Sequence, residues 1–165
     1  MSARQDRAVA AEAPVDEPMS KARLRLWLRF LKASRMIEAR LRDRLRAEFA
    51  TTLPRFDVMA ALSRYEAGLK MSELSGVLRV SNGNVTGIVD RLAEEGHVVR
   101  VPVPGDRRAA LVRLTAKGRA EFARQAAAHE AWIDEMLGDF GAAEAASVIR
   151  RLDALVAELG AKGVS

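Results

Sequence analysis

Polar side chains with the chemistry of base recognition recur along one short stretch in the middle of the chain. Asparagine amides pair bidentately with adenine, arginine pairs with guanine, and the methyl group of threonine contacts thymine. The stretch offers all three groups, at Asn82, Asn84, Thr86 and Arg91, with Ser81 just before them. Arg91 could instead hold a phosphate. A solvated helix face is the alternative interpretation of these residues.

Two further arginines, Arg107 and Arg108, follow a turn at residues 104–106. The runs on either side, Val98–Val101 and Ala110–Leu114, have the composition of two β-strands and predict a hairpin. Arginines beside the turn of such a hairpin can reach a minor groove while a neighbouring helix fills the major groove. The hairpin therefore favours DNA recognition over a merely solvated face.

The base-reading residues need a helix that packs its other side against a core. Four apolar residues at helical spacing predict that buried side: Val85, Ile88, Val89 and Leu92. Gly96 ends this helix. A shorter helix, with Ser72 as its N-cap and its end near Arg79, precedes it, so the two helices form a helix-turn-helix.

Further helices are predicted on both sides of this central part. Residues 20–50 lack Pro and Gly and carry apolar residues at helical spacing, and a second helix runs from residues 51–54 to Gly68. After the hairpin, helices are expected over 115–137 and 142–159. The predicted fold class is mainly α with a small β-hairpin wing.

The helix pair, the string VDRLAEEGHVVR and the string GDRRAALVRLTAKG resemble the MarR family of winged helix-turn-helix transcriptional regulators, over about Lys21–Leu159. The resemblance implies a homodimeric, ligand-responsive, sequence-specific DNA-binding protein, usually a repressor, and the predicted operator is palindromic. It also implies that Asp106 braces the wing and that Arg108 enters the minor groove. Gly83 and Gly87 depart from the family, which often has polar or basic side chains there.

Four parts are expected along the chain. Residues 1–19 have the composition of a disordered tail, 20–50 form a long helix for dimerisation and the effector cleft, 51–118 form the winged helix-turn-helix DNA-binding lobe, and 119–160 form C-terminal dimerisation helices. Apolar faces in both terminal regions suit intertwined dimerisation helices. Their folding back on their own chain is the alternative.

The resemblance further implies a small-molecule effector, held between the lobe and the dimerisation helices. Members of the family often bind aromatic carboxylates or phenols, and some bind aromatic acyl-CoA thioesters, the group to which SNGNVTGIVDRL is most similar. The first two predicted helices offer side chains for a ring and for a carboxylate or phosphates: Trp27, Arg29, Phe30, Arg35, Met36, Arg40, Phe56 and Met59. Core packing is the alternative role for the apolar members, and a solvated face for the arginines.

Composition limits the remaining functions. A net charge of +5 and a pI near 10.2 favour an anionic partner. The chain has no cysteine, which excludes disulfides and thiol chemistry, and its two histidines have no companion motif for a metal or cofactor. Because catalytic motifs and long apolar runs are lacking, we expect a cytoplasmic protein that is not an enzyme. A sequence-tolerant architectural DNA-binding protein without an effector is the alternative.

Overall fold

The computed structural model describes residues 18–79, 82–103 and 105–162, and the side chains of Asn82, residues 106–109 and Lys162 lie outside this description. The tail expected over 1–19 therefore falls almost wholly outside it. The chain divides into two compact units, Met1–Ala39 and Arg40–Ser165, and each is described by itself.

Helix α1 (Met19–Phe49) confirms the long helix expected from the uninterrupted apolar pattern. Up to Ala39, which closes the first unit, its described residues are exposed or half-buried, and several large apolar side chains are exposed: Leu24, Leu26, Trp27, Leu28, Phe30 and Met36. Only in the second unit does α1 bury residues, at Leu41 and Leu45. Within the described part of the first unit, this apolar surface therefore has no cover.

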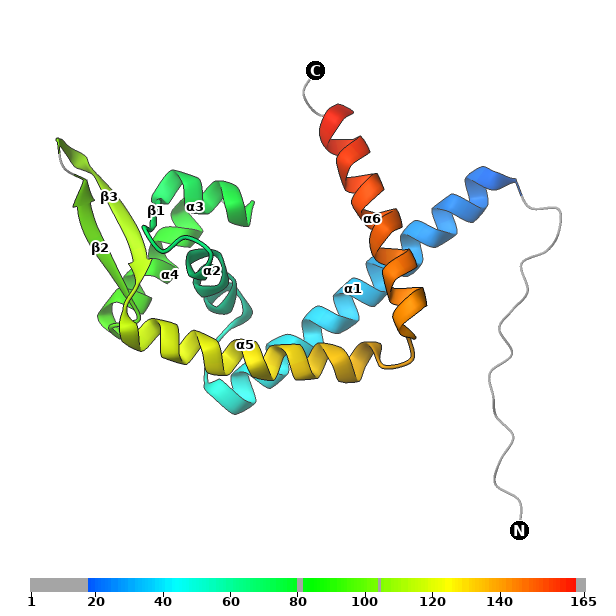
Figure 1. Cartoon of the computed structure of the whole chain (residues 1–165), viewed down its shortest axis with the longest axis horizontal. Coiled ribbons are helices and arrows are strands. Elements are labelled where there is room, and N and C mark those ends of the chain that lie inside the picture. The colour runs from blue at the N-terminus through cyan, green and yellow to red at the C-terminus, as the bar shows by residue number, and fades with distance from the viewer. Residues whose placement is uncertain (1–17, 80–81, 104, 163–165) are drawn as a thin grey trace, which may run out of the picture. The chain divides into compact units, whose positions relative to one another are not determined.

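The second unit contains a small lobe of helices and strands (Figure 1). The elements of the lobe are α2 (Leu53–Ser63), β1 (Leu69–Lys70), α3 (Met71–Leu78), α4 (Asn82–Glu94), β2 (Val98–Val103) and β3 (Asp106–Leu114). The three strands form an antiparallel sheet in the order β1-β3-β2. Along the chain, the elements follow the predicted order of a winged helix-turn-helix, with one strand added.

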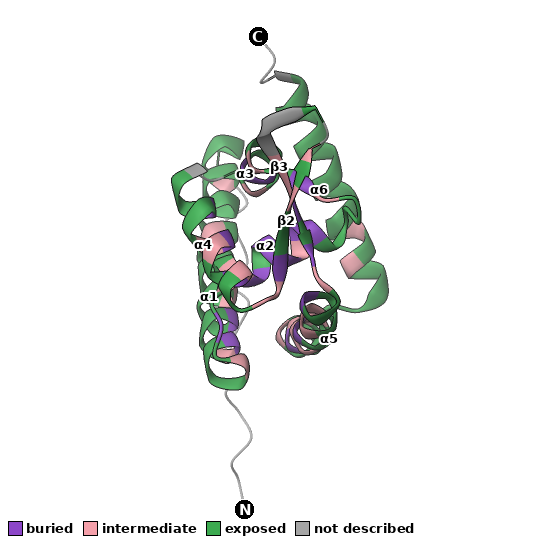
Figure 2. Cartoon of the chain, turned by 90° about the vertical axis from the view of Figure 1, so that its left-hand side faces the viewer, coloured by how far each residue is buried: buried purple, intermediate pink, exposed green. Residues whose placement is uncertain are grey.

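The core of the lobe lies where α2, α3 and α4 meet the sheet (Figure 2). Its fully buried side chains include Leu62 of α2, Leu74 of α3 and Val112 of β3. Val85, Val89 and Leu92 of α4 are also fully buried, and Ile88 packs against them half-buried, which confirms the predicted stripe. Since each such side chain contributes roughly 1.5–3 kcal/mol on burial, this stripe fixes which side of α4 is left to solvent.

Two helix boundaries and one strand differ from the sequence prediction. Helix α2 ends at Ser63, not at Gly68, because the chain leaves it in a turn in which Tyr65 N–H donates to Leu62 O at 3.1 Å. Gly68, at φ +93°, then turns the chain into β1, which is too short to leave a periodic pattern. The N-cap of α3 is Lys70, not Ser72, and its backbone N–H donates to Glu73 Oε2 at 2.7 Å.

The wing is followed by the last two helices, and its junction with the first of them is closely packed. Thr115, where a helix was expected to begin, caps α5 (Ala116–Leu137), because its Oγ1 accepts from Gly118 N–H at 3.0 Å and donates to Gly96 O at 2.7 Å. A Cβ on Gly118 would lie 1.9 Å from His97 O, so only glycine permits this approach. Helix α6 (Ala142–Lys162) follows. No helix of the described part is long and apolar enough to cross a membrane.

Candidate nucleic-acid interface

The solvent side of α4 carries the predicted base-reading residues in an uneven arrangement. Asn84, Thr86 and Arg91 are all exposed. At 100° per residue, Asn84 and Arg91 fall on one edge of the helix and Thr86 on the other. Asn84, Gly87 and Arg91 line a shallow pocket of about 260 Å³ together with residues from the start of α2, which identifies their edge as the one beside α2.

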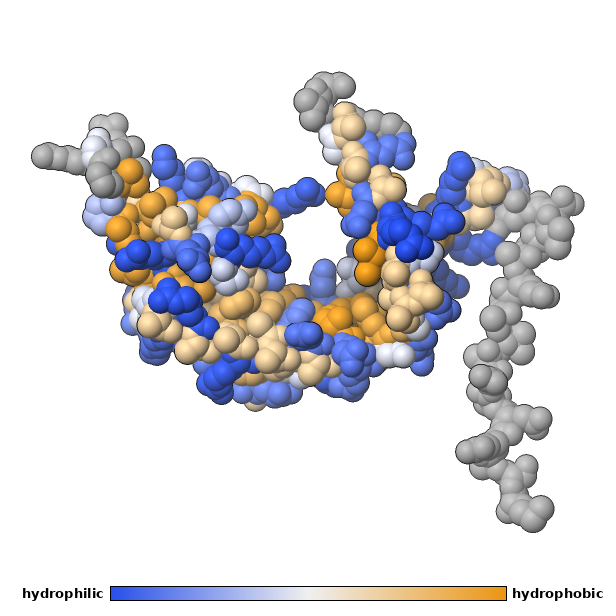
Figure 3. Space-filling model, viewed as in Figure 1, coloured by the Kyte–Doolittle hydropathy of each residue, from blue (hydrophilic) through white to orange (hydrophobic). Residues whose placement is uncertain are grey.

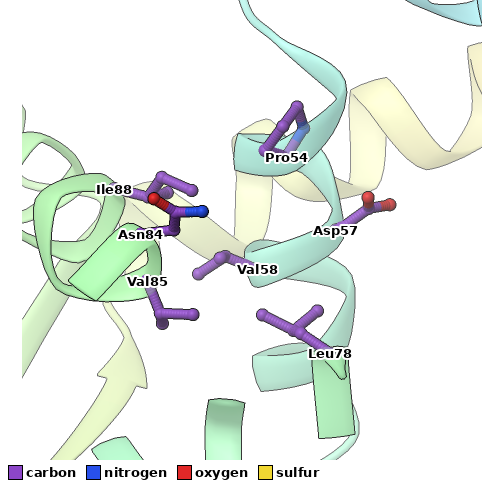
Figure 4. Close-up of a pocket in the computed structure, with 7 residues that line it drawn as sticks. All are labelled: Pro54, Asp57, Val58, Leu78, Asn84, Val85 and Ile88. Atoms are coloured by element: carbon purple, nitrogen blue, oxygen red, sulfur yellow. The ribbon is translucent and has the colours of Figure 1, made fainter. Parts of the chain in front are cut away.

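Asn84 lies closer to α2 than its place in the sequence suggests. Figure 4 shows its amide on the side of α4 that faces α2, at a pocket of about 360 Å³. Val58 of α2 and Leu78 of α3 line the same pocket, with Val85 and Ile88 of α4. Asn84 is still exposed, so its role as a base reader stays a prediction, at one edge of the helix face rather than its centre.

Two glycines occupy the part of α4 that lies farthest from the core. Gly83 and Gly87 are exposed, and a Cβ built on either would meet no heavy atom within 4 Å. Over the first two turns, the middle of the solvent side is therefore bare backbone, flanked by Asn84 on one edge and Thr86 on the other. Asp90 and Glu94 occupy the same side two turns further along. A face of this kind can come closer to a groove floor than one covered by long side chains.

Several predicted DNA contacts fall outside the described residues. Ser81 is one, and so are the side chains of Asn82, Asp106, Arg107 and Arg108. The backbone of β3 does place the arginines next to the turn, because Asp106 is the Cα partner of Val103. The wing position of both arginines is thus as expected, while their contacts and the bracing role of Asp106 stay predictions.

Ion pairs that the sequence analysis did not anticipate fix α4 to its neighbours. Arg100 of β2 contacts Asp90 of α4 at 2.6 Å, which joins the helix to the wing. Arg55 of α2 donates a hydrogen bond to Glu95, just past the end of α4, and Lys117 Nζ of α5 donates to Glu95 O at 2.7 Å. The Arg55 guanidinium holds the pKa of the Glu95 carboxyl below its usual value. These pairs orient α4 relative to α2, the wing and α5.

The candidate effector residues fall into an exposed and a buried group. Trp27, Arg29, Phe30, Arg35 and Met36 are exposed on α1 in the first unit, and Arg40 is exposed in the second. Phe56 and Met59 are buried on α2 within the second unit. The aromatic ring of Phe56 stacks on His129 of α5, with ring centroids 4.7 Å apart. Their proposed contact with an effector stays a prediction.

An aromatic and charged cluster at the end of α1 was also not anticipated. Trp132 of α5 is buried, and its ring meets Phe49 edge-on at 6.1 Å. Arg44 pairs bidentately with Glu135 at 2.7 and 2.9 Å, and this hydrogen bond lowers the pKa of Glu135. The cluster joins α1 to α5 within the second unit. Across the described part of the chain, no group of three or more histidines and carboxylates could hold a metal ion.

Comparison with known proteins places this architecture in a family. The model of the MarR family matches residues 51–110. The transcriptional activatory protein BadR of Rhodopseudomonas palustris is 35% identical over 135 residues, which cover 80% of this chain and 76% of that protein.

Solved structures have the same fold. A MarR family transcriptional regulator from Silicibacter pomeroyi aligns with a TM-score of 0.72 at 30% identity, over 87% of this chain and 99% of that one. A mutant of MarR from E. coli in complex with operator DNA aligns with a TM-score of 0.71 at 24% identity, over 84% of this chain and 99% of that one. On the sequence match over four fifths of its length, the chain belongs to the MarR family of transcriptional regulators.

Proposed function

We propose that the protein is a sequence-specific, DNA-binding transcriptional regulator that acts as a homodimer in the cytoplasm. The observation that carries the proposal is the division of α4 into a buried apolar side and a solvent side that exposes Asn84, Thr86 and Arg91. Such a helix can enter a major groove while its other side stays in the core of the lobe. The fold shared with the E. coli MarR mutant, which was solved with operator DNA, supports this use of the lobe.

Each contact of the proposed complex follows from side-chain chemistry. Asn84 and Thr86, with Asn82, approach base edges in the major groove, and Ser81 and Arg91 hold the adjacent backbone or a base. Arg108 enters the minor groove, with Arg107 at the backbone and Asp106 bracing the wing. The Asp90–Arg100 pair supports this arrangement because it couples the orientation of α4 to that of the wing.

Dimerisation is proposed from apolar surface that the single chain leaves exposed. Helix α6 has no buried residue in its described part, and Val148, Leu152 and Leu155 form an exposed stripe along it (Figure 3). The first unit, described by itself, also exposes apolar residues on α1. Patches of this kind are rarely left open in a folded monomer. A two-fold dimer carries two copies of α4 and should prefer a palindrome whose half-sites lie about 10 bp apart.

Selection of bound duplexes from a random pool tests the DNA proposal. The protein should enrich one palindromic consensus after several rounds at near-physiological salt. The spacing of the two half-sites should be about one helical turn. Failure to enrich any sequence would refute specific recognition, and a consensus without two-fold symmetry would refute reading by a symmetric dimer.

The direction of regulation depends on where the operator lies. The family resemblance favours a repressor, whereas BadR is named as an activatory protein. We propose repression, in which the bound dimer covers the promoter. A reporter fused to the native upstream region tests this choice, because deletion of the regulator should raise expression. A fall in expression would instead establish activation.

We further propose that an aromatic carboxylate or an aromatic acyl-CoA thioester releases the protein from DNA. The exposed Trp27, Phe30 and Met36 of α1 supply an apolar surface for a ring. Arg29 and Arg35 of the same helix, and Arg40 just beyond, supply cations for a carboxylate or phosphates. Phe56 and Met59 are both buried, so they would contact the ring only where the packing around them opens. A tenfold loss of operator affinity requires about 1.4 kcal/mol of preference for the non-binding state.

Titration of the protein–operator complex with hydroxycinnamic and benzoic acids and with their CoA thioesters tests the effector proposal. Release by the thioester alone would assign the CoA group and implicate the basic side of α1, whereas release by the free acid at a similar concentration would assign the carboxylate. Trp27 is exposed and Trp132 is buried, so Trp27→Phe separates their fluorescence signals. A complex that responds to neither class would refute the proposal.

A further inference from the structure

A groove separate from α4 and from the exposed part of α1 lies where α2 ends and α5 begins. Two pockets of about 440 and 380 Å³ adjoin there and share Glu66, Leu114 and Arg119 on their walls. Both volumes lie in the range of small-molecule sites, which runs from about 300 to 1,000 Å³. The groove therefore has room for a compact ligand.

The walls of this groove are held in place by the same strand. On one side, Gly68 ends the loop that carries Glu66, and a Cβ on Gly68 would lie 2.7 Å from Val112 O of β3. On the other side, Arg119 Nη1 donates to Leu114 O, at the end of β3, at 3.0 Å. Because β3 fixes both sides, the acid and the base keep their positions without pairing with each other.

The groove carries one carboxylate, Glu66, and two guanidinium groups, Arg119 and Arg113, beside an apolar floor. Leu62 and Leu114 are buried beneath it, and Phe122 is half-buried at its side. Glu66 is exposed, and its carboxylate forms no hydrogen bond or ion pair with any residue in the described ranges. Arg119 uses Nη1 for Leu114 O and keeps further N–H donors for a ligand.

We propose that this groove binds a free α-amino acid with an aromatic side chain. The ligand's carboxylate pairs with Arg119, its ammonium group pairs with Glu66, and its ring covers Leu62 and Phe122. A simple anion would satisfy only the arginines, and a simple cation only the glutamate. The site is distinct from the effector site proposed on α1 and does not depend on it.

A ligand in the groove would also contact β3, the strand that leads to the turn of the wing. The ligand touches the loop after α2, the start of α5 and the end of β3, and β3 continues to the arginines beside the hairpin turn. A ligand that bridges these three elements stabilises their native arrangement, because it binds the folded lobe and not the unfolded chain. The full chain should therefore show a higher melting temperature in its presence.

Calorimetric titration of the full chain without DNA tests the proposal. The probes are L-phenylalanine, 3-phenylpropanoate, which lacks the ammonium group, and 2-phenylethylamine, which lacks the carboxylate. L-Phenylalanine should bind at one site per chain, at least tenfold more tightly than either half-ligand. Absence of saturable binding, or equal affinity for all three probes, would overturn the proposal.

Two single variants test whether the ligand binds at Glu66. Glu66→Gln should weaken L-phenylalanine binding about tenfold and leave 3-phenylpropanoate binding unchanged, since only the ammonium contact is lost. Glu130→Gln, a matched change on an exposed part of α5 outside the groove, should bind like the wild type. Unchanged binding in Glu66→Gln would overturn the assignment. Because no DNA is present, this result is independent of whether the protein recognises an operator.

Discussion

Gly83 and Gly87 are residues that the folded chain itself does not explain. Each costs α4 about 1 kcal/mol relative to alanine. The glycines with positive φ are at 68, 96 and 105, and neither helical glycine has a neighbour that a Cβ would meet. The reason for the bare face must then come from outside the chain. We propose that the reason is duplex DNA, which would approach the helix backbone within the reach of a methyl group.

Gly87→Ala should therefore change stability and DNA affinity in opposite directions. Thermal unfolding should show a variant more stable by up to about 1 kcal/mol. Fluorescence anisotropy should show weaker operator binding, by about tenfold, because the added methyl group keeps the helix from the groove. Gly160→Ala, on α6, also adds its methyl group in open space, and it should leave operator affinity unchanged. A stabilised Gly87→Ala that binds DNA like the wild type would contradict this explanation.

At the scale of single elements, the features that depend on residues close together in the sequence could be predicted from it. The stripe of α4 and the start of α5 at Thr115 depend on residues a few positions apart, and both were predicted correctly. Strand β1 exists because Leu69 and Lys70 meet β3 more than forty residues later, which no local pattern records.

The same limit applies to the candidate site. Arg55 and Glu95 are forty residues apart, and only the packing of α2 on α4 brings them together. The sequence could place Asn84 on the solvent side of α4, but it could not show that α2 occupies that edge. The residue types of the site were therefore predictable, and its surroundings were not.

The contact between α2 and α5 predicts a dependence of stability on pH. Burial beside Phe56 lowers the pKa of His129 from 6.5. As pH falls below about 6.5, the unfolded chain therefore takes up a proton before the folded chain, and the free energy of unfolding decreases. Urea denaturation at pH 7.5 and pH 5 (about one unit or more either side of 6.5) should show a larger loss for the wild type than for His129→Gln. Equal losses would show that His129 titrates alike in both states.

At the scale of the whole molecule, the exposed apolar surface of α6 is the proposed dimer interface. If two chains cover this surface, Leu152→Asp places a charge in an apolar interface and should yield aggregate or unfolded chain. Ala157→Asp adds the same charge on the opposite side of α6 from the stripe and should remain a dimer in sedimentation. A well-folded Leu152→Asp monomer at micromolar concentration would refute an obligate dimer.

Specific reading of an operator by α4 and the wing is tested most directly by competition between two duplexes. Anisotropy at about 150 mM salt compares the selected palindrome with a scrambled duplex of equal length and composition. The wild type should bind the palindrome at least about 1,000-fold more tightly, and Arg108→Ala should lose about tenfold or more of that affinity. Arg113→Ala, at the other end of β3, removes the same charge and should bind like the wild type. Equal affinity for the two duplexes would contradict sequence-specific regulation and identify an architectural DNA-binding protein.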